Sequence, residues 1–384
     1  MLYFIFLTSF LALLIVWVIY PSLLFLLKYI LPDNKESQYS NKENNIFLTI
    51  IIAAHNEEKV IAQRIINILD ISSNDFDFEI IVMSDHSTDN TVSIVKNISY
   101  REPLVRVYEV KNGRGRAAAH NEALQHARGN ILVFTDAETE FSPGFLDAIG
   151  HAYDDPRVGF ASGQLVWKDN SEEETGDSVS LYWRFEIWLR MLESNLGLLA
   201  TGTGACCSVR KELFKELPLV SDVDCGTPID VAMQGYKIVL VPEAKAYDYV
   251  AATIRGEFAA RSRMTAKNFI ATVSHLGWLG VVQHPLISLG LFCHKLGRWF
   301  TPIFYFLTML SGTILLITER DDIFILIIVV VLWIFLIFSC IGAINTRIPI
   351  LGKLWLFLIA NLAFCAGIIQ ALFNRSPTEY KKII

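Results

Sequence analysis

Two carboxylates follow a short apolar run near the middle of the chain. Residues 131–134 are uniformly apolar and are predicted to form a buried strand that ends at Thr135. Asp136 and Glu138 come next, with one small residue between them. Parallel strands present functional groups at their carboxyl ends, and two hard oxygen ligands suit Mg²⁺ or Mn²⁺ holding a diphosphate. Asp-x-Glu also occurs in ordinary surface loops, so the surrounding sequence has to support a metal site.

An alternation of strands and helices surrounds these carboxylates. Strands are predicted at 46–53, 78–83, 104–110, 131–135, 158–166 and 238–241, and helices at 56–69, 91–98, 115–127 and 172–196. This order predicts an α/β fold whose mixed, mainly parallel sheet is flanked by helices and has right-handed crossovers. Polar side chains then meet at one edge of the sheet, after three strand ends: Glu57, Asp85, and Asp136 with Glu138.

The first turn of this alternation has no glycine-rich phosphate loop. It reads Ala53-Ala54-His55-Asn56-Glu57, and there is no Walker sequence elsewhere. A nucleotide-type fold without such a loop needs another device to hold a diphosphate. A cation bound by carboxylates would serve, which supports the metal-site interpretation of Asp136 and Glu138.

Long uncharged tracts predict a membrane protein. They cover residues 1–27, 301–318, 323–346 and 354–374. The first could extend about 39 Å as a helix, which exceeds the hydrocarbon core of about 30 Å. It lacks the basic start and cleavage site of a signal peptide, so we expect a permanent anchor. The net charge of −6, without a basic stripe, excludes nucleic acid as an expected partner, and the six scattered cysteines predict reduced thiols.

These tracts suggest a division of the chain. It consists of an anchor at 1–31, a polar linker at 32–45, a catalytic-type domain at 46–255, interfacial helices at 256–300, three transmembrane helices at 301–374 and a tail at 375–384. The acidic loop at 319–322 is expected outside, and Arg347 with Lys353 inside. A multi-pass protein of the cell (inner) membrane with a cytoplasmic catalytic domain follows. Four spans would place the basic tail outside, against the positive-inside rule.

Four motifs resemble, in order, those of family 2 glycosyltransferases, which are inverting enzymes of GT-A fold. They lie at 50–58, 84–89, 112–123 and 134–139. The likeness extends over most of 46–300 and points to membrane-bound bacterial members related to cellulose and hyaluronan synthases. It implies a nucleoside-diphosphate sugar donor, in particular a UDP-sugar held by the first turn, and a metal at Asp136 and Glu138. The family usually has Asp at position 138 and often Pro at position 53, so Glu138 and Ala53 are departures.

The resemblance also implies a set of donor-binding residues: Ala54, His55, Glu57, Asp85, Arg116, Asp136 and Arg263. Some have simpler explanations. Asp85 or Asp89 could cap the helix at 91–98; we assign the cap to Asp89 and ligand contact to Asp85. Glu57 could serve its helix dipole, and Arg116 could be a solvated charge.

The acceptor side is expected at the small residues Gly202, Gly204 and Ala205, which let a backbone approach a ligand closely. Inversion needs a carboxylate base on that side, and the candidates are Asp222, Asp224 and Asp230. Thr227 and Asp230 read as a capping box, which explains Asp230 structurally. Asp224 has no such role and matches the family's catalytic Asp, so we expect it to be the base, with Asp222 second. The family's preceding acid is here Val223.

A basic helix follows the catalytic-type domain. Polysaccharide synthases of the family have Gln-x-x-Arg-Trp where this chain has Ala260-Arg261-Ser262-Arg263-Met264. Arg263 is retained and could neutralise the departing diphosphate. An interfacial helix whose cations meet lipid headgroups is the alternative. The missing Trp argues against a processive polymerase.

The implied activity is transfer of a sugar to a hydroxyl of a lipid-linked or membrane-proximal glycan acceptor, in cell-envelope or exopolysaccharide biosynthesis. Membrane lipids are expected partners. A processive polysaccharide synthase and a catalytically silent membrane assembly partner remain as alternatives.

Overall fold

The structure is a computed structural model that describes residues 1–31, 46–71, 73–168, 175–219, 221–249, 254–318, 322–344 and 348–373. The predicted linker at 32–45, most of the loop at 319–322, Arg347 and the tail at 375–384 lie outside the described residues.

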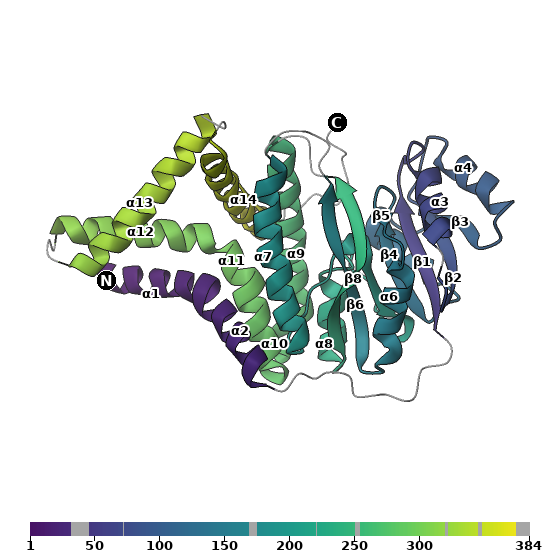
Figure 1. Ribbon diagram of the computed structural model, residues 1–384, viewed down its shortest axis with the longest axis horizontal. Helices are drawn as coiled ribbons and strands as arrows, with labels where there is room; N and C mark the ends of the chain where they lie inside the picture. Colours follow the sequence, from purple (N-terminus) through teal and green to yellow (C-terminus); the bar gives the residue numbers. More distant parts are fainter. Residues whose placement is uncertain are drawn as a thin grey trace.

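One eight-stranded sheet forms the centre of the catalytic-type domain (Figure 1). Its strands are β1 (Phe47–Ala54), β2 (Asp77–Ser84), β3 (Val105–Glu109), β4 (Ile131–Asp136), β5 (Glu140–Phe141), β6 (Val158–Lys168), β7 (Cys207–Arg210) and β8 (Lys237–Tyr249). The order is β3-β2-β1-β4-β7-β6-β8-β5. The first four neighbours are parallel, as are β6 and β8, whereas β7 is antiparallel to both of its neighbours. The predicted mixed, mainly parallel sheet is confirmed.

Helices cover both faces of the sheet and bury a separate core on each. They are α3 (Ile61–Ile71), α4 (Thr91–Ser99), α5 (Arg116–Ala123), α6 (Phe145–His151), α7 (Thr175–Asn195) and α8 (Gly226–Met233). Successive residues of a strand point to opposite faces. Ile50 and Ile52 therefore join the core beneath α3 and α6, while Ile51 joins the core beneath α5 and α8. β1 is apolar throughout because it is covered on both sides.

Three local expectations differ from the structure. Helix α3 begins at Ile61 rather than at 56, because Asn56 adopts a left-handed conformation (φ 56°) that cannot continue into a helix. β5 and β7 were not expected; strands of two and four residues are too short to show a periodic pattern. β8 continues to Tyr249, beyond the predicted end at 241.

The apolar tracts form helices that extend away from the sheet (Figure 1). α1 (Leu2–Leu14), a π-helical turn η1 (Ile15–Ile19) and α2 (Tyr20–Ile30) are continuous; α12 (Thr301–Thr318), α13 (Ile323–Ile344) and α14 (Pro349–Leu372) follow near the C-terminus. Four helices within the described residues are long and apolar enough to cross a membrane. The predicted membrane helices are thereby confirmed by length and composition.

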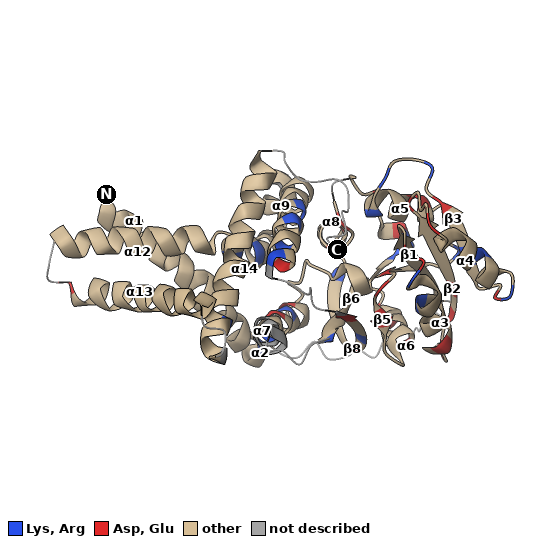
Figure 2. Ribbon diagram, turned by 90° about the horizontal axis from the view of Figure 1, so that it is seen from above, with Lys and Arg blue, Asp and Glu red and all other residues tan. Residues whose placement is uncertain are grey.

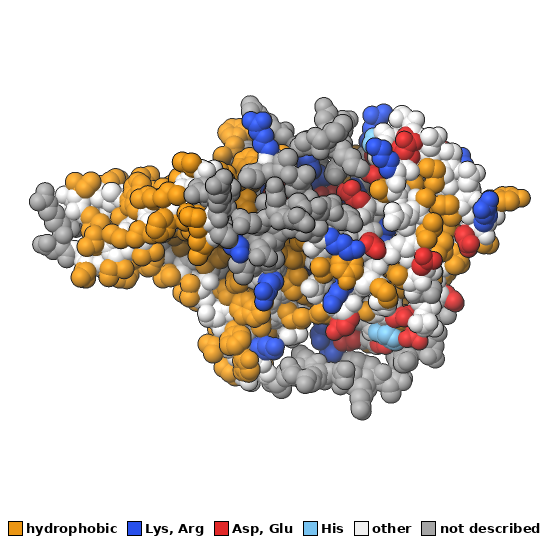
Figure 3. All heavy atoms as spheres, turned by 45° about the horizontal axis from the view of Figure 1, so that its top comes forward, with side chains coloured by type: hydrophobic (Ala, Val, Ile, Leu, Met, Phe, Trp, Pro, Cys, Tyr) orange, Lys and Arg blue, Asp and Glu red, His pale blue; other side chains and the backbone are white. Residues whose placement is uncertain are grey.

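A layer of helices separates these segments from the sheet. It contains α7, α9 (Ile254–Gln283), α10 (Pro285–Leu291), the π-helical turn η5 (Phe292–Leu296) and α11 (Gly297–Trp299). α9 bends at Gly277, whose backbone is not helical (φ 56°, ψ 175°). Figure 2 shows charged residues on α7 and α9 of this layer, in contrast to α1, α12 and α13. Figure 3 shows the same contrast on the surface, with hydrophobic side chains over the narrow end of the molecule and charged side chains over the end that contains the sheet.

Candidate functional site

Three parallel strands end together at one edge of the sheet. Ala53 of β1 is paired in register with Met83 of β2 on one side and with Asp136 of β4 on the other. The loops after all three strands therefore start from the same level. The predicted convergence of polar residues at this edge is confirmed.

The loops after β1 and β2 are held to each other by hydrogen bonds. His55 Nδ1 lies 2.5 Å from the Asp85 carbonyl oxygen, and Asn56 Oδ1 accepts a 2.8 Å bond from the Thr88 amide. The Glu57 amide donates to Thr91 Oγ1 at 2.8 Å. Asn at the left-handed position is favourable, because Asn tolerates this conformation better than most residues. The first turn is thus a rigid platform beside the end of β2.

Asp85 organises the neighbouring loop. Its Oδ2 accepts a 2.8 Å bond from the Gly115 amide, and its Oδ1 lies 3.0 Å from His86 Nδ1. The Asp85 amide in turn donates to the Ala54 carbonyl at 2.8 Å. Ala54 is buried, so its predicted role in donor binding cannot involve its side chain.

Asp89 binds the start of α4 but is not its N-cap residue, as it was expected to be. Its Oδ1 accepts a 3.0 Å bond from the Thr91 amide at the start of α4, and its Oδ2 accepts one of 3.1 Å from the Glu58 amide. The N-cap residue of α4 is Asn90, so Asp89 satisfies one unpaired amide of the helix from the position before the cap and binds the loop after β1 with its other oxygen. Asp85 does not cap α4.

Arg116 and Asp136 meet at the end of β4. Arg116 is the first residue of α5 and Asp136 is the last of β4. The distance between Arg116 Nη2 and Asp136 Oδ1 is 2.9 Å, and both side chains remain partly exposed. Arg116 is therefore part of the site and not an isolated solvated charge. A cation beside this carboxylate is suited to an anionic ligand.

Asp224 lies beside this ion pair, across Gly204. A Cβ atom on Gly204 would lie 3.5 Å from Asp224 Cγ and 3.6 Å from Arg116 Nη1. The Gly202 amide donates a 2.8 Å bond to the Asp224 carbonyl, which fixes the loop containing Asp224. The two glycines therefore lie directly beside the predicted base, and their acceptor-side role stays a prediction. Ala205 differs: its side chain is buried, and its carbonyl accepts a bond from Thr135 Oγ1 at 2.9 Å.

The surroundings of Asp224 make its carboxylate more basic. Burial raises the pKa of Asp224, and the nearby Asp222 raises it further, while Lys295 and Arg116 act in the opposite direction. A raised pKa strengthens a carboxylate as a general base. Val223, which replaces an acid of the family, is fully buried in the core beneath α5 and α8.

The other two candidate bases have protein partners. Asp222 Oδ1 lies 3.4 Å from Lys267 Nζ on α9. Asp230 Oδ2 lies 2.9 Å from His275 Nδ1. The predicted capping box is wrong, because α8 begins at Gly226 and no side chain caps it. Asp230 instead pairs α8 with α9.

Arg263 lies on α9 one turn before Lys267. Residues four apart share a face of a helix, so Arg263 points toward the same side as the cation that contacts Asp222. Its side chain is partly buried. This position is compatible with the predicted role toward a departing anion.

Asp136 and Glu138, the predicted metal ligands, lie at the end of β4 and in the turn that follows it. Glu138 is exposed in the turn after β4, two residues beyond Asp136. Among the described residues there is no group of three or more His, Cys, Asp or Glu side chains that could hold a metal ion. Mg²⁺ commonly binds through one or two carboxylates together with substrate phosphates. One partly exposed and one exposed carboxylate at this edge, Asp136 and Glu138, fit a cation that arrives with a diphosphate.

Sequence reasoning missed two cations near the site. Arg64 is buried under the end of β4, where its Nη2 donates to Thr135 Oγ1 at 2.8 Å. Burial lowers the pKa of Arg64 to about 9, against the attraction of Asp136 and Glu140, so it stays charged at neutral pH. Lys295 lies on η5 and acts electrostatically on Asp224. A lone Arg in the apolar stripe of α3 was the available signal for Arg64, and for Lys295 it was the basic stretch at 294–298.

A buried polar cluster joins the site's helices to the first membrane helix. His294 Nδ1 lies 2.7 Å from Glu193 Oε2 and its Nε2 lies 3.0 Å from Glu186 Oε1. Tyr20 donates to Glu193 at 2.6 Å, and Arg298 donates to Glu186 at 2.5 Å. Burial by itself lowers the pKa of His294, but the two carboxylates outweigh it and raise the pKa above its ordinary value. The cluster fixes η5, and with it Lys295.

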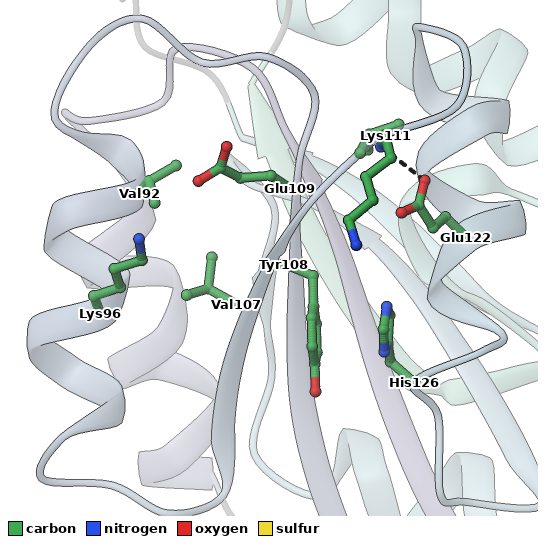
Figure 4. A pocket seen from close by; sticks show the side chains of 9 residues that line it. Val92, Lys96, Val107, Tyr108, Glu109, Lys111, Glu122 and His126 are labelled. Atoms are coloured by element: carbon green, nitrogen blue, oxygen red, sulfur yellow. Dashed lines mark hydrogen bonds between the residues drawn. The ribbon is translucent and has the colours of Figure 1, made fainter.

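A cavity of about 430 Å³ lies elsewhere, at the outer edge of the sheet (Figure 4). It is lined by residues of β3, α4 and the segment following α5, among them Lys96, Glu109 and Lys111. The Tyr108 and His126 rings stack in it, 3.7 Å apart. β3 is three strands away from β4 in the sheet, so this cavity is separate from the Asp136 site.

Comparisons with known proteins match part of the chain to one family and to several glycosyltransferases. Residues 49–218 match the family described as glycosyl transferase family 2. A dolichyl-phosphate β-glucosyltransferase of Trichomonas vaginalis is 32% identical over 105 residues, which are 25% of this chain and 30% of that protein. A poly-β-1,6-N-acetyl-D-glucosamine synthase of Staphylococcus aureus is 24% identical over 229 residues, or 56% of this chain and 53% of that one.

A solved structure shares the fold over nearly the whole chain. The mannosyltransferase PcManGT of Pyrobaculum calidifontis, in complex with GDP-mannose and Mn²⁺, has a TM-score of 0.71 at 20% identity and covers 98% of this chain and 100% of its own. This likeness shows the GT-A fold. The chain spans about a third to a half of the length of the two curated relatives.

Proposed function

We propose that this chain, a glycosyltransferase with a family 2 domain, moves a sugar from a nucleoside-diphosphate sugar to a hydroxyl of a membrane-associated acceptor, with inversion at the anomeric carbon. The observation that carries the proposal is the meeting of Asp224, Arg116 and Asp136 around Gly204 at the carboxyl edge of the sheet. A base on one side and an anion-binding group on the other are the two requirements of in-line displacement.

Asp224 acts as the base in this mechanism. Its carboxylate accepts the proton of the acceptor hydroxyl as that oxygen bonds to the anomeric carbon. The bond from this carbon to the phosphate oxygen breaks, and its electron pair leaves with the nucleoside diphosphate. Arg116, at the start of α5, and Arg263, on α9, stabilise the negative charge that develops on the leaving group.

Asp136 and Glu138 would hold a divalent cation. A bound Mg²⁺ or Mn²⁺ supplies Lewis-acid stabilisation of the diphosphate. Arg116 already occupies one oxygen of Asp136, so it holds that carboxylate in place before the donor arrives. The Mn²⁺ in the mannosyltransferase complex supports a divalent ion of this kind.

The acceptor is proposed to be lipid-linked or a glycan at the membrane surface. The loop containing Asp224 leads into α8, which packs on α9, and α9 in turn contacts the membrane-type helix α14. The base is therefore separated from the apolar helices by one layer. The dolichyl-phosphate substrate in the name of one relative supports a lipid acceptor.

A processive synthase is the less favoured activity. Met264 stands where processive members of the family have Trp, and it is 53% exposed. A flexible, exposed side chain offers no flat surface on which an acceptor sugar could stack. The relatives include a poly-β-1,6-N-acetyl-D-glucosamine synthase, so the processive activity is also tested, by the length of the products.

The test is transfer from radiolabelled UDP-, GDP- and dTDP-sugars with Mn²⁺, using purified full-length protein. Polyprenyl phosphate, diacylglycerol and a short glycan serve as separate acceptors, and products are resolved by chain length. One sugar added to one acceptor class supports the proposal. A ladder of products would establish the processive alternative, and no turnover together with no thermal shift for any donor would establish a silent assembly partner.

A further inference from the structure

We propose that α14 lies along the membrane surface against the catalytic domain, and that the chain crosses the membrane three times, through α1, α12 and α13. By length and composition alone, residues Ile350–Leu372 qualify as a fourth span. The way in which α14 packs contradicts that assignment. This inference is independent of the proposed activity.

α14 and α9 touch backbone to backbone. Ala363, Gly367 and Ala371, which recur every four residues along α14, are all buried. A Cβ atom on Gly367 would lie 2.5 Å from the Ser262 carbonyl oxygen and 3.1 Å from the Ala266 amide of α9. Small residues in this pattern allow two helices to approach closely. The second half of α14 therefore runs at the level of residues 262–266.

That level of α9 is charged. Arg261 and Arg263 lie next to the contact with Gly367, and Lys267 follows it directly. Lys267 reaches Asp222 of the catalytic domain at 3.4 Å. Charged side chains are strongly disfavoured in the hydrocarbon core. The second half of α14 is consequently outside that core, beside the catalytic domain.

The first half is too short to cross alone. The Phe357 ring lies 5.6 Å from the Trp17 ring, and Trp17 stacks at 6.0 Å on Phe185 of α7. Phe357 also lies 6.1 Å from the Phe335 ring of α13, so it lies where the apolar helices meet the catalytic-domain layer. Beyond it only residues 349–356 remain, about 12 Å of helix against a core of about 30 Å, and they include Lys353.

The figures agree with this placement. Figures 1 and 2 share the same long axis, and in both views α14 occupies the layer of α7 and α9. In Figure 2 its axis runs across the long axis, while α1 and α12 run mainly along it on the far side of the layer; α13 lies on that side too, tilted to the long axis in Figure 1.

The two faces of α14 suit a position between protein and lipid. At 100° per residue, Ile369 and Leu372 fall on the face opposite the Ala363–Gly367–Ala371 stripe, whereas Ile350, near the start of the helix, falls to one side of it. These three large side chains are 51%, 66% and 66% exposed. An apolar face directed away from the protein, on a helix in the membrane plane, is expected to sink into the headgroup and acyl boundary.

Three spans also place the charges consistently. With α13 as the last crossing, the end of α14 is on the side of the catalytic domain. The sequence places Arg347, Lys353, Arg375, Lys381 and Lys382 after that crossing, on the same side as Lys28 and Arg298. The positive-inside rule is then satisfied at every basic segment, which four spans do not achieve.

Single-cysteine labelling of the full-length protein tests this topology. Cys340 and Cys365 are replaced by Ala; the other four cysteines are buried. Phe373→Cys, 70% exposed at the end of α14, is compared with Tyr100→Cys, 93% exposed in the catalytic domain, and with Asp322→Cys between α12 and α13. A membrane-impermeant maleimide is applied to intact cells and to inverted vesicles. Phe373→Cys should label from the same side as Tyr100→Cys and opposite to Asp322→Cys.

Labelling of Phe373→Cys together with Asp322→Cys would overturn the proposal. A second measurement covers the case in which lipid shields position 373. Full-length protein fused at its C-terminus to alkaline phosphatase or to a fluorescent protein reports the side of the tail directly. The fusion to the fluorescent protein is expected to fluoresce, and the fusion to alkaline phosphatase is expected to be inactive. An active phosphatase fusion would establish four crossings.

Discussion

Arg116 and Asp136 form an ion pair, with 2.9 Å between Nη2 and Oδ1, at the point where β4 ends and the candidate site begins. The pair joins the start of α5 to the end of the central parallel strands. It holds the Asp136 carboxylate at the edge of the sheet, next to the loop of Asp224. The predictions below depend on these three residues and on the helices that fix them.

Asp136→Ala should abolish cation-dependent donor binding, because it removes the metal ligand held by Arg116. Calorimetric titration of the nucleotide sugar with and without Mn²⁺ measures this. Asp155→Ala is the matched control, since it breaks an Asp–Arg pair that precedes β6 and is not part of the candidate site. Equal donor affinity in Asp136→Ala and the unchanged protein, with Mn²⁺ present, would contradict the metal assignment.

Asp224→Asn should lower turnover by about 10²–10⁴, the usual contribution of a general base, while leaving donor affinity nearly unchanged. Asp230→Asn serves for comparison, because Asp230 pairs with His275 and is not assigned to proton transfer. Steady-state rates at saturating donor separate the two variants. A larger loss in Asp230→Asn than in Asp224→Asn would exclude Asp224 as the base.

The pH profile should reflect the raised pKa of Asp224. The base must be deprotonated, so activity is lost as pH falls through a pKa that lies above the ordinary value of about 3.9 for Asp. Lys295 lowers this pKa, so Lys295→Met should move the acid limb of kcat to higher pH. Lys96→Met, on α4 beside the outer cavity, should leave the limb in place. An acid limb unmoved by Lys295→Met would show that Lys295 does not act on the base.

His294→Ala should destabilise the protein by about 3–5 kcal/mol, the usual effect of breaking a buried ion pair, since Glu193 loses its only described cationic partner and Glu186 keeps only Arg298. The control His151→Ala removes an exposed pair and should cost at most about 1 kcal/mol. Thermal unfolding in detergent compares them.

The same histidine predicts a pH dependence of stability. The folded-state pKa of His294 is raised, so its contribution is fully present below the unfolded value of about 6.5 and is lost as pH rises through the folded pKa. The gap in unfolding temperature between wild type and His294→Ala should therefore narrow at alkaline pH. A gap that widens with pH would contradict a charged His294.

Gly204→Ala should fold normally but lose activity. The new Cβ meets its neighbours at ordinary van der Waals distance, 3.5–3.7 Å, yet it lies between Asp224 and Arg116. Gly226→Ala is the contrasting variant: its Cβ would lie 2.7 Å from His275 Nε2, so unfolding at lower temperature is expected. Undiminished turnover in Gly204→Ala would place the reacting sugar elsewhere.

The amino-acid sequence by itself determined the α/β class, the strand ends that carry Asp85 and Asp136, and the apolar helices. The helices and strands follow from local periodicity of apolar residues. The shared edge follows because right-handed crossover connections make successive strands parallel, so that their carboxyl ends lie together. The sequence also indicated that Asp224 lies in the loop before α8. Periodicity could not find β5 and β7, because such short strands exist only through their neighbours.

Tertiary structure alone decided which charges act together. Asp230 matched a capping box locally, yet its partner is His275, 45 residues away, because α8 packs against α9. Arg64 and Lys295 belong to the site only through burial and through the position of η5. α14 has the composition of a span, but its small residues face the charged helix α9. Composition measures what a helix would gain from lipid, whereas packing decides whether lipid or protein surrounds it.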